Sequence, residues 1–302
     1  KEKISNILTS SASDNVNVER IDSLENVTIT TGNSCISKIP DDPYLRVYCF
    51  DVGQGDSIFI SNNGETMLID ASTNEMGSTV VNYLNELGVK KIDYLVGTHP
   101  HEDHIGGLDN VIKNFEIGEL KFKDFEVFVP NRSEEHTFEI GTIYMPKVPA
   151  NTKTYEEVID IISEKKLKVT TPKIGDTFSV GNAECEVMHV GTSTEDLNET
   201  SIVIKMDFNN ISYLFTGDAN YNVENSRKWP EIDILKVGHH GSSSSSTASF
   251  LNQTKPKVAL ISCGKGNSYG HPTLKALDRL SKIGAKVYRT DEDETILITE
   301  TN

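Results

Sequence analysis

The stretch Thr98-His99-Pro100-His101-Glu102-Asp103-His104 places three histidines and two carboxylates within seven residues. It follows the apolar run 92–97, which predicts a buried strand, and it precedes Gly106-Gly107 and a helical pattern over 108–115. We therefore expect a loop at the carboxyl end of a strand, where α/β proteins commonly bind ligands. Imidazole and carboxylate groups suit zinc, iron and manganese, so the loop predicts a metal site rather than a solvated polar turn.

The composition is that of a globular protein with a core of its own. The chain has 302 residues, of which 36% are hydrophobic, so one large domain can bury enough apolar surface to fold. No run in the sequence approaches the ~18 consecutive apolar residues of a membrane span. A transmembrane segment is therefore not predicted.

Residues 1–42 are predicted to be a flexible N-terminal segment, because 10–17 and 26–33 are rich in Ser, Thr and Asn. Such a segment is typical of the tail or tether of an exported protein. We therefore expect an extracellular or cell-surface-tethered location, with the cytoplasm as the alternative. The folded domain is predicted to span residues 43–302.

The net charge of -16 makes the surface acidic and argues against a protein that holds long nucleic acid in a basic groove. Nucleotide chemistry stays open, because bound divalent cations would bring positive charge to the place where an anionic substrate must lie. The expected substrate is a small or cell-wall-linked phosphoester, and nucleic acid is the less favoured alternative.

Strands and helices alternate in a pattern typical of a layered α/β fold. A β-meander over 45–69 is followed by a helix at 78–87 and by the strand before the metal loop. The sequence of residues 115–118 recurs at 138–141, so we interpret 119–140 as an insertion, either a surface elaboration or a lid. A second β-rich half follows, and two sheets with helices outside both are the predicted architecture.

Three polar residues of the second half follow predicted strands. Asp218 comes after the strand 213–215, and His239 and His240 come after the apolar strand 232–237. Asp218 alone would be an ordinary turn residue, but a pair of histidines at the end of a strand favours a place in a site.

Three further residues are candidates for contact with a substrate. Asn198 lies in a polar cluster, and Ser242 begins a serine-rich loop. His271 follows the predicted strand 258–263 and precedes a helix. Each of them is expected in a loop near the carboxyl ends of the strands, where a crevice would form.

In this order, the polar clusters resemble those of the metallo-β-lactamase fold hydrolases. Within them the chain resembles the branch that contains the soluble hydrolase domain of ComEC-type competence proteins and the pneumococcal-type phosphorylcholine esterases. The resemblance covers about residue 45 to the end, apart from 119–140. Its motifs are Phe50-Asp51-Val52-Gly53-Gln54-Gly55-Asp56, Met67-Leu68-Ile69-Asp70, His99-x-His101-x-Asp103-His104, Thr216-Gly217-Asp218-Ala219, His239-His240-Gly241-Ser242 and Tyr269-Gly270-His271-Pro272.

The resemblance implies an αββα sandwich with two divalent metal ions at one edge, zinc in first place and manganese as the alternative. His239 would complete the second metal, with His240 as the alternative. Asn198 stands where many members of the family have a further histidine, and an amide oxygen is a weaker ligand for zinc. The other implied ligands are His99 and His101 for the first metal, Asp103 and His104 for the second, and Asp218 as the bridge.

Two cations about 3.5 to 4 Å apart can supply hydroxide at neutral pH and hold the oxygens of a phosphoryl group. We therefore expect hydrolysis of a phosphoester, most of all a phosphodiester, by attack of metal-bound hydroxide. Asp103 would orient the hydroxide and accept its proton, while His240 or His271 would contact the substrate oxygens or protonate the leaving group.

Two other functions use the same residue types. A β-lactamase or thioesterase would direct the same hydroxide at a carbonyl group. A non-catalytic zinc module is the other alternative, but structural zinc sites are closed by four ligands and often contain cysteine. The ligand candidates here are more numerous and include no cysteine, which favours an open catalytic site.

Overall fold

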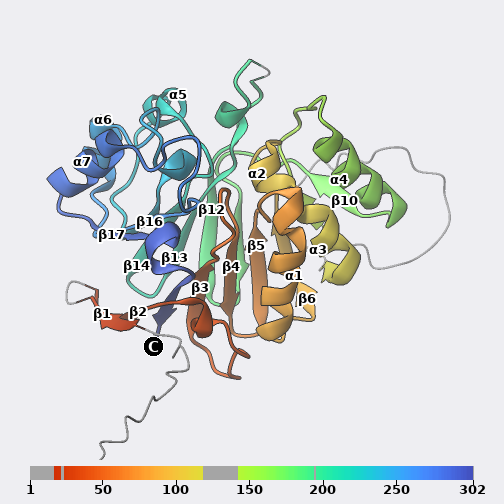
Figure 1. Ribbon diagram of the computed structural model, residues 1–302, viewed down its shortest axis with the longest axis horizontal. Coiled ribbons are helices and arrows are strands. Elements are labelled where there is room, and N and C mark those ends of the chain that lie inside the picture. The colour runs from red at the N-terminus through yellow and green to blue at the C-terminus, as the bar shows by residue number, and fades with distance from the viewer. Residues whose placement is uncertain (1–16, 22–23, 118–141, 194, 302) are drawn as a thin grey trace, which may run out of the picture.

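The computed structural model describes residues 17–21, 24–117, 142–193 and 195–301. Two sheets form its centre, with the strand orders β1-β2-β18-β3-β4-β5-β7-β9-β10 and β11-β12-β13-β14-β15-β16-β17. Helices cover the outer sides of both sheets (Figure 1). This arrangement confirms the predicted αββα sandwich.

The strands of the first sheet are β1 (Asn17–Arg20), β2 (Val27–Thr31), β3 (Leu45–Cys49), β4 (Ile58–Asn62), β5 (Glu65–Ile69), β7 (Tyr94–Val96), β9 (Thr142–Tyr144), β10 (Lys168–Thr170) and β18 (Ile296–Glu300). Those of the second are β11 (Thr177–Val180), β12 (Ala183–His189), β13 (Val203–Phe208), β14 (Ile211–Phe215), β15 (Ile234–Lys236), β16 (Val258–Ile261) and β17 (Lys286–Arg289). A small third sheet pairs β6 (Lys91–Ile92) with β8 (Glu116–Ile117).

The α-helices are α1 (Gly77–Glu86), α2 (Glu102–Ile105), α3 (Leu108–Asn114), α4 (Lys153–Glu164), α5 (Tyr221–Asn225), α6 (Ala248–Thr254), α7 (Leu274–Lys282) and α8 (Thr290–Asp293). Short 3₁₀ turns are η1 (Asn33–Cys35), η2 (Asn74–Met76), η3 (Leu197–Thr200) and η4 (Gly238–Gly241). None of the helices in the described part of the chain combines the length and the apolar content that crossing a membrane requires.

The central strands β3, β4, β15 and β16 are buried on both faces, which explains why they are apolar nearly throughout. In β4, Ile58 and Ile60 face the second sheet and join the core between the sheets, whereas Phe59 faces outward. Phe59 packs in the layer formed with α1, α3 and α4. On the other side, α5, α6 and α7 cover the second sheet in the same way (Figure 1). Alternate residues of one strand thus stabilise two different layers.

Parallel pairing brings the site loops to one edge of each sheet. β5 runs parallel to β7, and β14, β15 and β16 run parallel to one another. Asp70 and residues 98–104 therefore follow neighbouring strands of the first sheet, as residues 216–218 and 238–241 do in the second. A hydrogen bond from Ile202 N to Thr98 O, 2.9 Å long, joins the two edges.

The predicted start of the folded domain at residue 43 is wrong for the described residues that precede it. β2 pairs with β18, and Val27 and Ile29 lie in the core between the sheets. Threonines fill the alternate positions of β2, so the Thr- and Asn-rich composition concealed a strand with one apolar face. The predicted insertion at 119–140 lies outside the described residues.

Candidate metal centre

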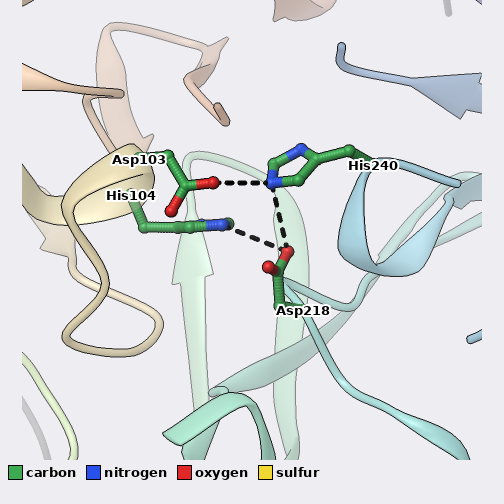
Figure 2. A group of neighbouring side chains, drawn as sticks. All are labelled: Asp103, His104, Asp218 and His240. Carbon is green, nitrogen blue, oxygen red and sulfur yellow. Dashed lines mark ion pairs between the residues drawn. The ribbon is translucent and has the colours of Figure 1, made fainter. Parts of the chain in front are cut away.

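Four predicted site residues meet where the two sheet edges face each other, as Figure 2 shows. Asp103 and His104 belong to α2, Asp218 follows β14, and His240 lies in η4. His104 Nε2 is 3.1 Å from Asp218 Oδ1, and His240 Nε2 is 3.2 Å from Asp103 Oδ2 and 3.6 Å from Asp218 Oδ1. One ligand atom from each of the four lies within 4.8 Å of the others, which is a spacing that a single cation can span.

A second group of ligand atoms adjoins the first and shares Asp218 with it. His99, His101 and Asp218 also place one ligand atom each within 4.8 Å of the others. His99 Nε2 is 3.8 Å from Asp218 Oδ2, the oxygen that does not contact His104. One carboxylate therefore faces both groups, as a bridging ligand between two metal ions would.

Several of these atoms are buried without a hydrogen-bond partner among the described residues. Such atoms are rare in folded proteins, because an unpaired buried polar atom raises the free energy of the folded state. A bound cation would remove that cost, so the donor set fits divalent metal ions. The atoms are His104 Nε2, Asp218 Oδ1 and His240 Nε2, and Asn198 Oδ1 and His271 Nδ1 are also buried without such a partner.

The opposite ring nitrogens of the histidines are held in place. His104 Nδ1 lies 2.7 Å from Asp70 Oδ2, and His240 Nδ1 lies 2.9 Å from the carbonyl oxygen of Ser262. The Thr98 hydroxyl donates a hydrogen bond to Asp70 Oδ2 at 2.7 Å, and its oxygen Oγ1 lies 3.1 Å from His99 Nδ1. These contacts orient the rings so that each Nε2 points into the site, as in histidines that bind metals.

The backbone around the histidine pair has an unusual conformation. His239 and His240 have φ values of 50° and 52°, in the left-handed region that costs free energy for residues with a Cβ atom. The next residue, Gly241, has a φ of 81°, and a Cβ atom there would lie 2.5 Å from Pro272 Cβ. This close approach brings the loop before α7, which carries His271, against η4.

The choice of His239 as the ligand of the second metal does not fit this arrangement. The His239 side chain is 26% exposed, and its Nε2 lies 3.6 Å from Asp218 Oδ2 without joining either ligand group. The His240 side chain is 1% exposed and belongs to the group with Asp103 and His104. The strained turn directs the second histidine inward, so it is His240, the alternative candidate, that lies beside Asp103 and His104.

The other predicted contacts lie around this centre. Asn198 lies in η3, where its backbone N–H donates to Asp196 Oδ1. The His271 ring lies 5.5 Å from the His239 ring and 6.5 Å from the His240 ring. Ser242 Oγ lies 3.0 Å from Ser244 Oγ, within the serine loop.

A buried ion pair that was not predicted from the sequence lies next to the candidate centre. Lys236, at the end of β15, is 1% exposed, and its Nζ donates to Asp56 Oδ2 at 2.6 Å. Asp56 Oδ1 lies 3.2 Å from His240 Nδ1, so the pair contacts a candidate ligand. A lysine within an otherwise apolar strand was the available signal. Gly55 allows the turn that carries Asp56 to approach the backbone of α2, because a Cβ atom there would lie 2.4 Å from Asp103 O.

The charges of the centre favour protonated histidines when no cation is bound. Burial alone would lower the pKa of His240, but the carboxylates of Asp218 and Asp56 outweigh it and raise the pKa to about 10. Burial likewise opposes the charge on His104, yet Asp218 and Asp70 hold its pKa well above the usual value. Protons on these two rings thus balance the buried carboxylates.

Metal uptake should therefore release protons. We expect loading of the metal-free protein with zinc at pH 7 to release about two protons per chain, because both rings must give up a proton to bind a cation. Calorimetric titration in two buffers of different ionisation enthalpy measures this number. An apparent binding enthalpy that is the same in both buffers would contradict the charge balance described above.

A family comparison identifies the chain. The family model of the metallo-beta-lactamase superfamily matches residues 50–265. The chain belongs to this superfamily. Among similar proteins, ComE operon protein 3 of Bacillus subtilis is 28% identical over 83% of this chain, and Competence protein ComA of Neisseria gonorrhoeae is 28% identical over 81%. Recombination protein 2 of Haemophilus influenzae is 27% identical over 82% of the chain.

The chain spans about a third of the length of these relatives, since the matches cover 32%, 31% and 28% of them, respectively. The relatives confirm the resemblance to ComEC-type proteins. Among solved structures, the metallo-beta-lactamase fold protein YhfI from Bacillus subtilis is similar with a TM-score of 0.52 and 11% identity, covering 84% of this chain and 99% of that chain. CmlA, a diiron beta-hydroxylase from Streptomyces venezuelae, has a TM-score of 0.50 and 15% identity, with 83% and 53% covered. At these identities the two structures support the fold alone.

Proposed function

We propose that this domain is a metal-dependent hydrolase of phosphoesters and that phosphodiesters are its substrates. The observation that carries the proposal is the position of Asp218, whose two carboxylate oxygens face two adjacent groups of ligand atoms. A pair of neighbouring cations can hold both the attacking and the leaving oxygen of an in-line displacement at phosphorus. The superfamily of the chain, whose members are generally metal-dependent hydrolases, supports the same reading.

The two groups divide the ligands between two metal ions, which we propose to be zinc, with manganese as the alternative. Asn198 would add an amide oxygen to the first position, which would weaken the first position relative to an all-histidine set. When bound, the two ions would act as Lewis acids and provide a nucleophile near neutral pH. The proposed ligands are His99 and His101 at the first position, Asp103, His104 and His240 at the second, and Asp218 between them.

Asp103 is the proposed proton acceptor. Burial opposes its charge, but His104 and the contact with His240 hold the pKa of the carboxyl well below its usual value, so it is ionised at neutral pH. Its side chain is 28% exposed, whereas those of His104, Asp218 and His240 are almost fully buried. Asp103 can therefore contact both the centre and an incoming substrate.

His271 is proposed to contact the leaving group. Burial and the nearby His239 and His240 lower the pKa of its ring, so the ring is neutral at pH 7. A neutral imidazole can donate a hydrogen bond through its N–H group, which suits the stabilisation of negative charge on a departing oxygen. Ser242 is the proposed hydroxyl contact to a phosphoryl oxygen.

For the substrate and the location of the domain, we propose only a class of compound and a compartment. The acidic net charge of -16 favours a small or cell-wall-linked phosphodiester over long nucleic acid. Relatives named for competence and recombination keep nucleic acid as the second candidate. These relatives also support an extracellular or cell-surface location for the domain, which we propose.

A substrate panel on metal-loaded protein tests the function. We expect about two metal ions per chain after supplementation with zinc or manganese, and turnover of bis(p-nitrophenyl) phosphate that a chelator abolishes and added metal restores. Nitrocefin should not be hydrolysed, because the proposed site is built for a phosphoryl group. Less than one metal ion per chain, or nitrocefin turnover faster than that of every phosphodiester, would rule the proposal out.

A further inference from the structure

An exposed aromatic ring packs against His271, beside the candidate metal centre. Tyr269 is 68% exposed, yet its ring stacks on that of His271 with 5.8 Å between centroids and 24° between planes. The His271 ring in turn lies 6.5 Å from that of His240, at 27°. Three roughly parallel rings thus lead from a candidate metal ligand to solvent, and the outer face of the last one is open.

The loop that carries Tyr269 is held in place by hydrogen bonds. Asn267 Oδ1 accepts from Tyr269 N at 3.1 Å and from His271 N at 3.0 Å, and Asn267 Nδ2 donates to Gly264 O at 2.9 Å. The exposure of Tyr269 is therefore a property of an ordered loop. A fixed aromatic ring beside a polar centre is typical of a surface that binds a ligand.

We propose that Tyr269 is a specificity-determining residue, whose ring stacks on a planar aromatic ring of the substrate, namely the base of a nucleotide. The inference rests on the proposed phosphodiesterase function and deepens it: the phosphodiester group lies at the metal centre while the base lies on Tyr269. Every base has a π face, so stacking on a single open ring accepts bases of any sequence. A quaternary ammonium group is better held by several rings around one point, whereas Tyr269 offers one face.

Matched variants and substrates test this role. Tyr269→Ala removes the ring and Tyr269→Phe keeps it, while Leu274→Ala alters a side chain five residues further along the chain that is 85% exposed and carries no ring. For a dinucleotide, Tyr269→Ala should raise KM about tenfold with little change in kcat, since stacking of one base on an aromatic side chain has an effect of about 5- to 100-fold. Tyr269→Phe and Leu274→Ala should resemble the wild type.

Two phosphodiesters without a base complete the experiment. KM for glycerophosphoglycerol should be the same in all four proteins, because this substrate has no ring to stack. An equal rise of KM for the dinucleotide and for glycerophosphoglycerol in Tyr269→Ala would overturn the proposal, as would an unchanged KM for both. A rise for glycerophosphocholine as large as that for the dinucleotide would also overturn it, since Tyr269 would then recognise a cation.

A binding measurement separates this inference from the proposed function. If the wild type hydrolysed no phosphodiester, the proposed function would fail, but Tyr269 could still be tested with a methylphosphonate-linked adenosine dinucleotide, which resists hydrolysis. We expect the wild type to bind this probe about tenfold more tightly than Tyr269→Ala, with Tyr269→Phe close to the wild type. Equal affinity of the wild type and Tyr269→Ala would overturn the stacking role.

Discussion

Replacement of Asp103 by alanine is expected to lower kcat/KM for phosphodiesters by about 10³-fold, because it removes both a ligand and the proposed proton acceptor. The fold should persist, since Asp103 is the most exposed member of the group with His104, Asp218 and His240. Metal content should fall from about two ions per chain towards one, as the first ligand group does not include Asp103. Steady-state kinetics, metal analysis and the melting temperature measure the three effects.

Asp109→Ala is the matched control for this variant. Asp109 lies on α3 in the same stretch of chain, is 17% exposed, and pairs with Lys113 rather than with a candidate ligand. Its loss should leave kcat/KM near the wild-type value and alter stability by less than about 1 kcal/mol. If Asp103→Ala hydrolysed phosphodiesters at the wild-type rate, the proposed role of Asp103 would be wrong.

The central loop could be predicted because its information is local. Residues 98–104 hold their ligand types close together in sequence, and the apolar run before them marks the end of a strand. The two-sided burial of strands such as β4 likewise follows from their nearly continuous apolar composition. Local patterns of this kind predicted the layers of the fold and the loops that carry the site.

The choice between the two neighbouring histidines could not be predicted, because it depends on contacts between distant parts of the chain. Which of His239 and His240 points inward depends on two left-handed backbone conformations, and these depend on the packing of Gly241 against Pro272. That contact joins loops that are far apart in the sequence, so no pattern in residues 238–241 predicts it. The strand β2 was not predicted for the same reason. Its residue Ile29 pairs with Ile298 of β18, at the other end of the chain.

Lys236 shows that a buried charge can be anticipated from the sequence when the unfavourable free energy of burying it is considered. A lysine that ends an apolar strand must either be exposed or have a partner, because an unpaired buried ammonium group is strongly unfavourable. Here the partner is Asp56, which lies in a glycine-containing turn. The turn and the strand are 180 residues apart, so the need for a partner was predictable but its identity was not.

Lys236→Met is expected to reduce the free energy of unfolding of the metal-free protein by about 3–5 kcal/mol, because it breaks a buried ion pair and leaves only the charge of the nearby histidines to balance the Asp56 carboxylate. The double variant Asp56→Asn/Lys236→Met should lose less unfolding free energy than the sum of the losses in the two single variants, since both members of the ion pair are then uncharged. Urea denaturation of the four proteins measures the coupling. Lys257→Met is the control, because the Lys257–Asp233 pair is exposed at the lysine end and should contribute less than about 1 kcal/mol.

The pH dependence distinguishes lost charge from lost packing. Burial opposes the charge on Asp56, but Lys236 and His240 lower its pKa to about 2, so in the wild type the carboxylate stabilises the fold above pH 3.8 and that contribution is lost as the pH falls through about 2. Without Lys236 the folded-state pKa of Asp56 should rise, because only the nearby histidines then offset the effect of burial. The loss of unfolding free energy in Lys236→Met should then be larger at pH 7 than at pH 4, where Asp56 can take up a proton. If the loss of unfolding free energy were equal at both pH values, Lys236 would act through packing alone. The ion pair would then not hold Asp56 in its charged form beside the candidate metal centre.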